Sequence, residues 1–191
     1  QVKEMMHQKW PEAGYIAYFQ AFTNTHAPVE VLKRKYEAVL ECDPNIVGLS
    51  IGTRPDCLPD DVVEYLGELN QRVNLWVELG LQTMHDQTGK LINRGHDFKT
   101  LVEGVEKLRK HNIDVIIHII NGLPGETREM MLETAKAVAK LDVQGIKIHL
   151  LHVIDGTPMH KMLDKGMLQL MDKDEYIDLV VDQLEILPPE M

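Results

Sequence analysis

Polar side chains recur at alternate positions of several strand-like runs in this sequence. In Trp76–Gln82, Glu78 and Gln82 share one side, while hydrophobic residues occupy the other. The same alternation places four more polar side chains on that side of other runs, namely Ser50, His118, Lys147 and His149. Such groups can exchange protons, form hydrogen bonds and, for the lysine amine, attack a carbonyl. A buried ion pair such as Glu78–Lys147 would explain any one of them structurally, but six on one side favour a ligand site.

Two polar or glycine-containing segments directly follow strand-like runs, and a third follows the short helix expected at Met84–Ile92. Asn121–Thr127 reads Asn-Gly-Leu-Pro-Gly-Glu-Thr, which permits a tight turn with close backbone approach to a ligand and a threonine cap for the next helix. Arg94, in Asn93-Arg94-Gly95-His96, suits bidentate binding of a carboxylate, although a solvated surface arginine is the plain structural alternative. The segment Gln20–Thr25 offers polar groups and backbone amides, or is a simple loop.

The elements that must position these groups are strands alternating with amphipathic helices. Hydrophobic residues with helical spacing, such as Phe98, Leu101, Val105 and Leu108, separate the strand-like runs. Strand–helix units in series predict a parallel sheet. Because only one face of each strand is apolar, we expect a partial, open TIM-like barrel with helices outside, not a flat sheet covered on both faces. The predicted strands are Tyr15–Gln20, Ile46–Gly52, Leu75–Thr83, Asp114–Asn121 and Gly145–Val153.

The composition of the chain argues against some classes of protein. The 191 residues carry 20 Lys and Arg against 30 Asp and Glu, a formal net charge of −10, so nucleic acid binding by this segment alone is not expected. No apolar run is long enough to span a bilayer. Cys42 and Cys57 suit free thiols in a reducing compartment, and a cytoplasmic protein is expected. His149 and His152 would point to opposite faces of a strand, so no metal site is predicted.

Six segments together carry a family resemblance over nearly the whole chain. They are Tyr15–Thr25, Gly48–Asp56, Trp76–Thr83, Ile92–His96, Ile120–Thr127 and Lys147–Val153. In this order they resemble the radical S-adenosylmethionine (SAM) superfamily, in its MiaB/NifB-like group and the YhcC/YtqA-like branch. The resemblance implies a six-stranded partial TIM barrel, of which residues 1–191 would form a single domain containing strands two to six.

The resemblance also implies SAM and a 4Fe-4S cluster as cofactors of the intact protein. In this family a CxxxCxxC loop holds the cluster, and this chain has only two cysteines, so we expect no cluster on this chain alone. Where relatives often have Gly-Gly-Glu for the methionine amino end, this chain has Gln20, Ala21, Phe22 and Thr23.

The remaining implied SAM contacts follow the later strands. Gln82 and Arg94 correspond to contacts with ribose and carboxylate, and His118 stands where relatives have a ribose-binding acid. The interior residues Ser50 and Glu78 belong to the same site. The adenine wall would be formed by Gly122, Leu123, Leu151 and His152.

The function implied for the intact protein is reductive cleavage of SAM to methionine and a 5′-deoxyadenosyl radical, which abstracts hydrogen from an unidentified substrate. An electron donor would be a further partner, and this chain alone is expected to be inactive. Two alternatives stay open: a TIM-barrel lyase that uses Lys147 as a Schiff-base amine, and a non-catalytic binding module. Val2, Met5 and Met6 predict a helix at the start, and we expect both ends to be truncated.

Overall fold

The fold is built on a parallel sheet of five strands. The computed structural model describes residue 5 and residues 9–191, so Val2 and Met6 of the predicted first helix lie outside the described residues. The strands follow one another across the sheet in chain order, and every neighbouring pair is parallel. They are β1 (Tyr15–Phe19), β2 (Ile46–Thr53), β3 (Asn74–Gln82), β4 (Asp114–Asn121) and β5 (Gly145–Leu150).

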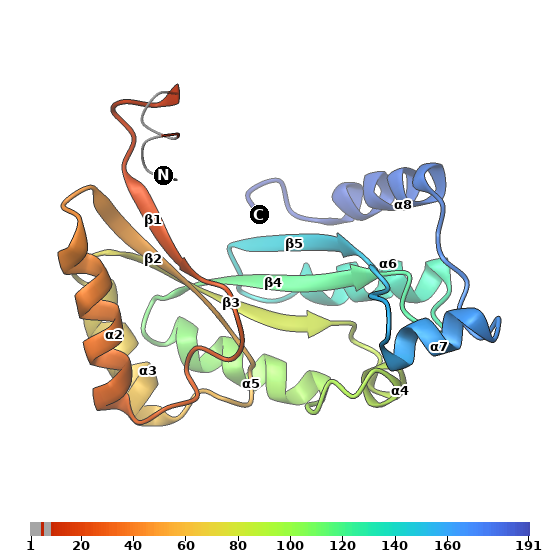
Figure 1. The fold of residues 1–191 in the computed structure, drawn as a ribbon, viewed down its shortest axis with the longest axis horizontal. Coiled ribbons are helices and arrows are strands. Elements are labelled where there is room, and N and C mark those ends of the chain that lie inside the picture. Colours follow the sequence, from red (N-terminus) through yellow and green to blue (C-terminus); the bar gives the residue numbers. More distant parts are fainter. Residues whose placement is uncertain (1–4, 6–8) are drawn as a thin grey trace.

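Helices connect the strands and cover one face of the sheet (Figure 1). After β1 to β4 come α2 (Val29–Cys42), α3 (Asp60–Asn70), α4 (Asp86–Leu91) with α5 (Phe98–Arg109), and α6 (Arg128–Val138). After β5, the chain forms α7 (Pro158–Asp164) and α8 (Lys173–Ile186), and α8 packs on α6. The strands form an open half-barrel, as predicted, because the order runs from β1 to β5 without pairing of those two strands among the described residues.

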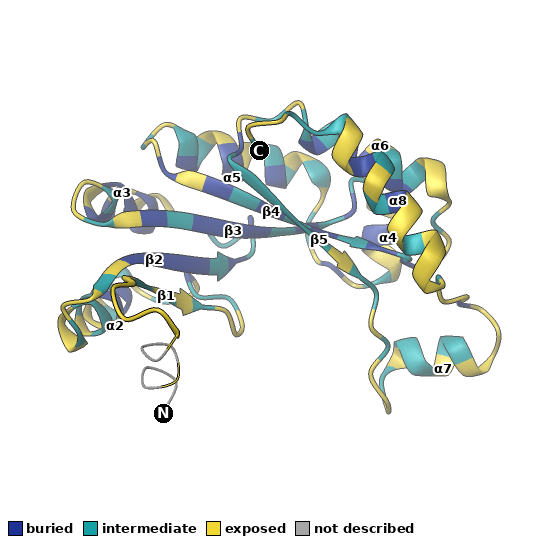
Figure 2. Cartoon of the chain, turned by 90° about the horizontal axis from the view of Figure 1, so that it is seen from above, coloured by how far each residue is buried: buried dark blue, intermediate teal, exposed yellow. Residues whose placement is uncertain are grey.

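The hydrophobic core lies between the sheet and the covering helices. Leu49, Ile51, Val77 and Ile117 point to this side and are fully buried. The central strands are accordingly mostly buried, while the helices expose their outer faces (Figure 2). The predicted alternation of β3 is confirmed: its odd-numbered residues pack in the core, and Glu78 faces a cavity on the other side. No helix in the described part of the chain is long and apolar enough to cross a membrane.

Local sequence signals set the helix starts. The side chains of Thr127 and Thr157 accept hydrogen bonds from backbone N–H groups in the first turns of α6 and α7. Asp172 and Glu175 form the capping box that begins α8. Three strands end earlier than predicted, and the first of them is β1, which ends at Phe19. β3 ends at Gln82, whose φ of 67° lies in the left-handed region, and β5 ends at Leu150.

Candidate cofactor and substrate site

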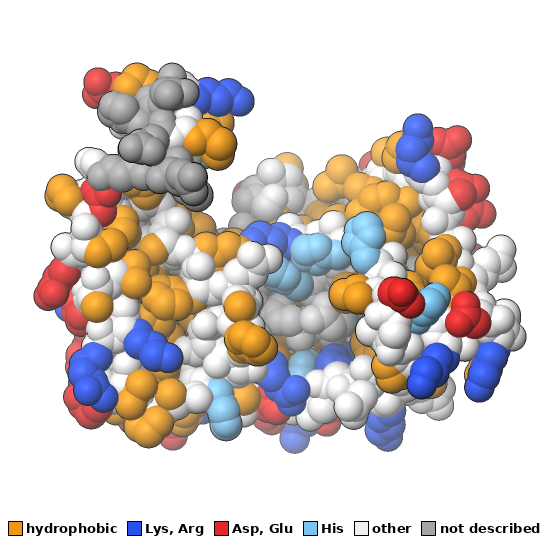
Figure 3. All heavy atoms as spheres, viewed as in Figure 1, with side chains coloured by type: hydrophobic (Ala, Val, Ile, Leu, Met, Phe, Trp, Pro, Cys, Tyr) orange, Lys and Arg blue, Asp and Glu red, His pale blue; other side chains and the backbone are white. Residues whose placement is uncertain are grey.

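A cavity of about 600 Å³ lies on the polar face of the sheet, towards the carboxyl ends of the strands. This volume is in the range of small-molecule sites. Figure 3 shows Lys, Arg and His side chains along the edge of a hollow in the middle of the visible face. All five strands or the loops that follow them contribute to the lining, which comprises Tyr18, Gln20, Phe22, Gly52, Thr53, Arg54, Glu78, Gly80, Gln82, Ile92, Arg94, His96, His118, Ile120, Lys147 and His149.

The carboxylate of Glu78 is the centre of a polar network in this cavity. Its side chain is only 2% exposed. Oε1 accepts from Ser50 at 2.6 Å and from Trp76 at 3.2 Å, and Oε2 accepts from Tyr18 at 2.7 Å. Lys147 Nζ lies 2.7 and 2.6 Å from the two carboxylate oxygens. His118 Nε2 lies 2.7 Å from Oε2.

This network fixes the charge of Glu78. Burial acts to raise its pKa, but hydrogen bonds from Lys147, Ser50, Tyr18 and His118 outweigh burial and lower the pKa to about 2. Burial, with Glu78 beside it, raises the pKa of Tyr18 to about 12. The cavity therefore has an ionised carboxylate at its floor, and that carboxylate orients the donors that face a ligand.

Lys147 is paired with Glu78, which bears on the lyase hypothesis. Its side chain remains 38% exposed and its Nζ lies 4.7 Å from the centre of the Tyr18 ring. Because Nζ is hydrogen-bonded to both carboxylate oxygens, and only a free amine attacks a carbonyl, this geometry does not favour a Schiff base at Lys147. The ion pair that the sequence offered as a structural explanation is present, and it forms part of the cavity.

Two imidazoles extend the network towards solvent. His149 Nε2 lies 3.2 Å from His118 Nδ1, and the ring centres are 5.1 Å apart. Burial lowers the pKa of both histidines, and the nearby Lys147 acts in the same direction. Both ring nitrogens of His118 thus have protein partners, so the predicted ribose contact would have to displace one of them.

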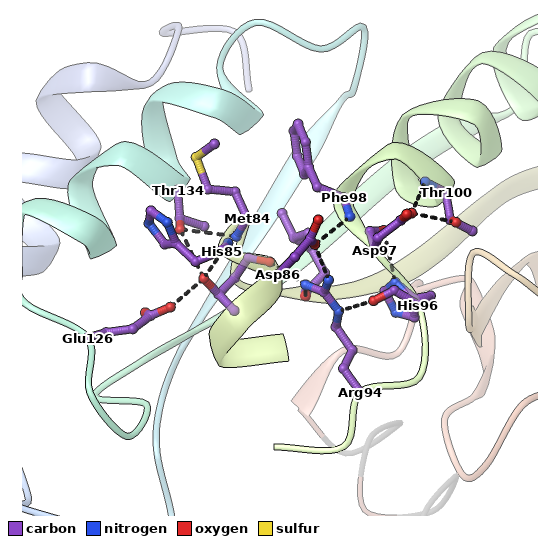
Figure 4. A network of polar contacts seen from close by, with 12 residues as sticks. Met84, His85, Asp86, Arg94, His96, Asp97, Phe98, Thr100, Glu126 and Thr134 are labelled. Carbon is purple, nitrogen blue, oxygen red and sulfur yellow. Dashed lines mark hydrogen bonds and ion pairs between the residues drawn. The ribbon is translucent and has the colours of Figure 1, made fainter. Parts of the chain in front are cut away.

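Arg94 joins the segment around α4 to the end of β3 by hydrogen bonds (Figure 4). Its side chain is 3% exposed. Nε donates to His96 O at 2.8 Å, Nη1 donates to Leu81 O and Thr83 O at 3.0 and 2.5 Å, and Nη2 donates to Asp86 Oδ1 at 2.8 Å. A guanidinium has five N–H bonds, so at most one is left for a ligand carboxylate. The predicted carboxylate contact therefore stays a prediction, and the observed role of Arg94 is to fasten the α4 segment to the end of β3.

A second fastening joins the ends of β3 and β4. Thr83 Oγ1 hydrogen-bonds to Glu126, and Thr134 Oγ1 accepts from the backbone N–H of Met84 at 3.3 Å (Figure 4). Burial raises the pKa of Glu126. The loops that would contact a ligand are thus fixed by side chains beneath them.

Backbone strain coincides with the cavity at two positions. Phe22 and Gln82 have φ values of 65° and 67°, and both line the cavity. For side chains other than glycine this region is unfavourable by about 1–2 kcal/mol. A register shift lies between Gly80 and Gln82, and a Cβ on Gly80 would lie 2.7 Å from Gln82 Nε2. Gly80 therefore leaves the space that the Gln82 amide occupies, while the ring of Phe22 is 97% exposed at the rim.

Comparison with known families fits this architecture. Residues 1–138 match the radical SAM superfamily, and residues 143–191 match the radical SAM C-terminal domain. This chain belongs to the radical SAM superfamily. The resemblance seen in its sequence is confirmed.

Relatives of this radical SAM chain are found in bacteria and archaea. "Uncharacterized protein YtqA" of Bacillus subtilis is 68% identical over 190 residues, which cover 100% of this chain and 59% of YtqA. "Protein YhcC" of Escherichia coli is 42% identical, with 93% of this chain and 57% of YhcC covered. The chain therefore spans under three fifths of these relatives. Elp3 of Methanocaldococcus infernus, solved with an N-terminal deletion, has the same fold, with a TM-score of 0.84, 22% identity and coverage of 99% of this chain and 49% of Elp3.

The structure divides the predicted SAM contacts of this radical SAM chain between two hollows. Six of them, Gln20, Phe22, Glu78, Gln82, Arg94 and His118, line the central cavity. Ser50 is buried beneath it on Glu78. The predicted adenine wall is elsewhere: Gly122, Leu151 and His152 line a second hollow of about 420 Å³, and Leu123 is buried. Ala21 and Thr23 lie in the loop of Phe22 but outside the lining of either hollow.

Sequence reasoning missed at least two residues that line the central cavity and one that supports a loop beside it. Tyr18 lines the cavity, and the alternation rule applied to the first strand would have found it. Arg54 directly follows β2, forms an ion pair with Asp56 at 2.7 Å and also lines the cavity. Asn24 fixes the loop after β1, because its Nδ2 donates to Phe19 O and Gly52 O at 2.8 Å each. Its local sequence carries no signal for this bridge.

The cofactors implied by the radical SAM family differ in how they fit. The central cavity has the size and the polar groups for SAM. The cluster does not fit on this chain, since its two cysteines, Cys42 and Cys57, do not have the spacing of a CxxxCxxC loop. Cys42 and Cys57 are free thiols, and residues 5 and 9–191 contain no group of three His, Cys, Asp or Glu placed to hold a metal ion.

Proposed function

We propose that this chain forms the SAM-binding and substrate-binding half-barrel of a radical SAM enzyme. The observation that carries the proposal is the central cavity, which lies at the carboxyl ends of parallel strands and is lined from all five of them. Active sites of TIM-like barrels occur at this end, because the loops there converge. The residues of this cavity would hold SAM, and together with a cluster held elsewhere in the whole protein SAM would supply the radical chemistry of the family.

In this proposal, the residues of the rim hold SAM. The Gln82 amide can both donate and accept hydrogen bonds, which suits ribose hydroxyls. Phe22 presents an exposed ring on a strained backbone, and a strained residue at a site is a reason to suspect a ligand contact. Gln20 adds a second amide at the end of β1. The second hollow, with Gly122 and Leu151, continues the same edge of the sheet.

The residues of the floor would meet the substrate. Lys147, His118 and His149 present N–H groups and imidazole nitrogens, and the buried Glu78 holds the first two in place. An electron donor and an unidentified substrate are the partners that this function requires. The lyase alternative lacks support, because Lys147 is bound to Glu78 as an ammonium.

The test is SAM binding by the anaerobically prepared full-length protein with its cluster, measured by equilibrium dialysis. Gln82→Gly removes the amide and relieves the positive φ, so the fold should not suffer. Loss of two hydrogen bonds of ordinary net strength should weaken SAM binding about 5- to 150-fold.

Asn93→Gly is the matched control. Asn93 also has a positive φ, of 56°, but its side chain is exposed outside the cavity lining. Its replacement should leave SAM affinity unchanged. Equal affinities of wild type and Gln82→Gly would show that SAM does not bind at the end of β3.

A further inference from the structure

Three side chains form a continuous hydrogen-bonded line from the cavity floor towards solvent. Glu78 Oε2 lies 2.7 Å from His118 Nε2, and His118 Nδ1 lies 3.2 Å from His149 Nε2. Glu78 is buried, His118 is partly buried, and His149 is exposed on β5 at the wall of the cavity. The line therefore joins a buried charge to a nitrogen base that a ligand can reach.

The positions of the protons follow from the partners. Glu78 is ionised and only accepts, so His118 must carry its proton on Nε2. The Nδ1 of neutral His118 is then an acceptor, and His149 must donate to it from Nε2. This leaves Nδ1 of neutral His149 with a lone pair, and none of the described residues forms a hydrogen bond to that nitrogen. His149, at the outer end of the line, is one of the residues that line the cavity.

We propose that His149 is the general base of this cavity and that His118 and Glu78 form its proton relay. A bound molecule gives a proton to His149 Nδ1, and the electron pair of the broken bond stays on that molecule. His149 then passes its Nε2 proton to His118 Nδ1. His149 is again neutral, and the ionised Glu78 balances the imidazolium formed at His118.

The charged and titratable groups around His149 are consistent with its acting as a base. Lys147 on β5 and His152 after β5 disfavour an extra positive charge on His149, whereas Glu78 on β3 favours it. Burial lowers the pKa of both histidines, so they are neutral and able to accept a proton near pH 7. Tyr18 on β1 keeps its proton, since its pKa is about 12.

The same neighbours indicate the class of substrate. The Lys147 ammonium lies on the same side of β5 as His149, two residues away, and repels a cationic group. It stabilises an oxyanion, which forms when a hydroxyl loses its proton. A hydroxyl-bearing substrate therefore suits the base better than an ammonium-bearing one. This inference rests on the proposed substrate cavity, but it concerns groups that can be observed without SAM.

The test is NMR of the full-length protein labelled with ¹⁵N in histidine, without cluster, SAM or substrate. At pH 8 both His118 and His149 should carry the proton on Nε2. Their titrations should be coupled, each showing two steps. His118→Phe keeps a ring but removes the acceptor, so His149 should titrate in one step and lose its tautomer preference.

A second variant protects the test if His118→Phe does not fold. His149 is exposed, so His149→Phe should be tolerated. In this variant His118 should titrate in one step, and its hydrogen bond to Glu78 should keep the proton of neutral His118 on Nε2. His152→Gln is the control, outside the relay, and should leave both tautomers unchanged. A proton on Nδ1 of neutral His149, or titrations unaffected by removal of the other histidine, would overturn the relay.

Two probes test the substrate class on the same sample. Trifluoroethanol should shift the His149 Nδ1 resonance in a saturable way, whereas the cationic trifluoroethylammonium should not. The opposite result would overturn the assignment to hydroxyl substrates. If Gln82→Gly weakens SAM binding but the NMR results fail, the relay is wrong and the proposed function stands. If the relay is observed but Gln82→Gly binds SAM normally, the SAM placement fails instead.

Discussion

The buried Glu78 should make the free energy of unfolding of this protein depend on pH in the acid range. Replacing Glu78 by glutamine should remove that part of the pH dependence. Its pKa is about 2 in the folded chain against an ordinary value of 4.5. A group with a lowered folded pKa contributes stability that is present above its unfolded pKa and is lost as pH falls through the folded pKa. The difference corresponds to about 3 kcal/mol at pH 5 and above, of which about 1 kcal/mol remains at pH 3.

Glu78→Gln should therefore lower the free energy of unfolding most at pH 5 and least at pH 3. The glutamine keeps the shape but not the charge that holds Lys147 and His118. The expected loss is about 3 kcal/mol at pH 5, and about 2 kcal/mol of this difference from wild type should disappear at pH 3. Urea unfolding of both proteins at a series of pH values gives the difference, and the range below pH 5 keeps histidine titration small.

Other carboxylates with lowered pKa, such as Glu37 and Asp56, also contribute to acid unfolding. They are present in both proteins, so the difference isolates Glu78. Glu64→Gln, at an exposed position of α3, is the matched control and should change the free energy of unfolding little at any pH. A difference between Glu78→Gln and wild type that is the same at pH 5 and pH 3 would refute the reasoning.

Two further substitutions, at Arg94 and in the turn at Gly125, are tested by denaturant unfolding. Arg94→Ala leaves three carbonyl oxygens at the mouth without their donor and should lower the free energy of unfolding by about 3 kcal/mol or more, whereas exposed Arg34→Ala on α2 should change it little. A loss below 1 kcal/mol would mean that Arg94 is free for a ligand. Gly125→Ala places a Cβ in open space at a φ of 78°, so only the backbone penalty of about 1 kcal/mol should appear, and a loss of several kcal/mol would contradict that.

The sequence by itself determined the order and nature of the elements. Strand alternation in β3 separated Val77 from Glu78, and helical spacing and capping residues such as Thr127 fixed the helices, because these signals act between residues close in the chain. The motifs also identified the radical SAM superfamily, since family segments are read in sequence. The end of β3 was predicted one residue too late, because the left-handed backbone of Gln82 has no local signal.

Only the tertiary structure decided which of these polar groups meet. Glu78 gathers donors from β1, β2, β4 and β5, and Arg94, which lines the cavity, uses most of its N–H groups to bind carbonyl oxygens and Asp86. Gln82 lines the central cavity, whereas Gly122 lines the second hollow at the same edge of the sheet. A hydrogen bond is sensitive to changes of a few tenths of an ångström in the distance between its two atoms, and packing of the strands and helices sets that distance for residues remote in sequence. Residue type and parity alone therefore predicted a polar interior but not its partners.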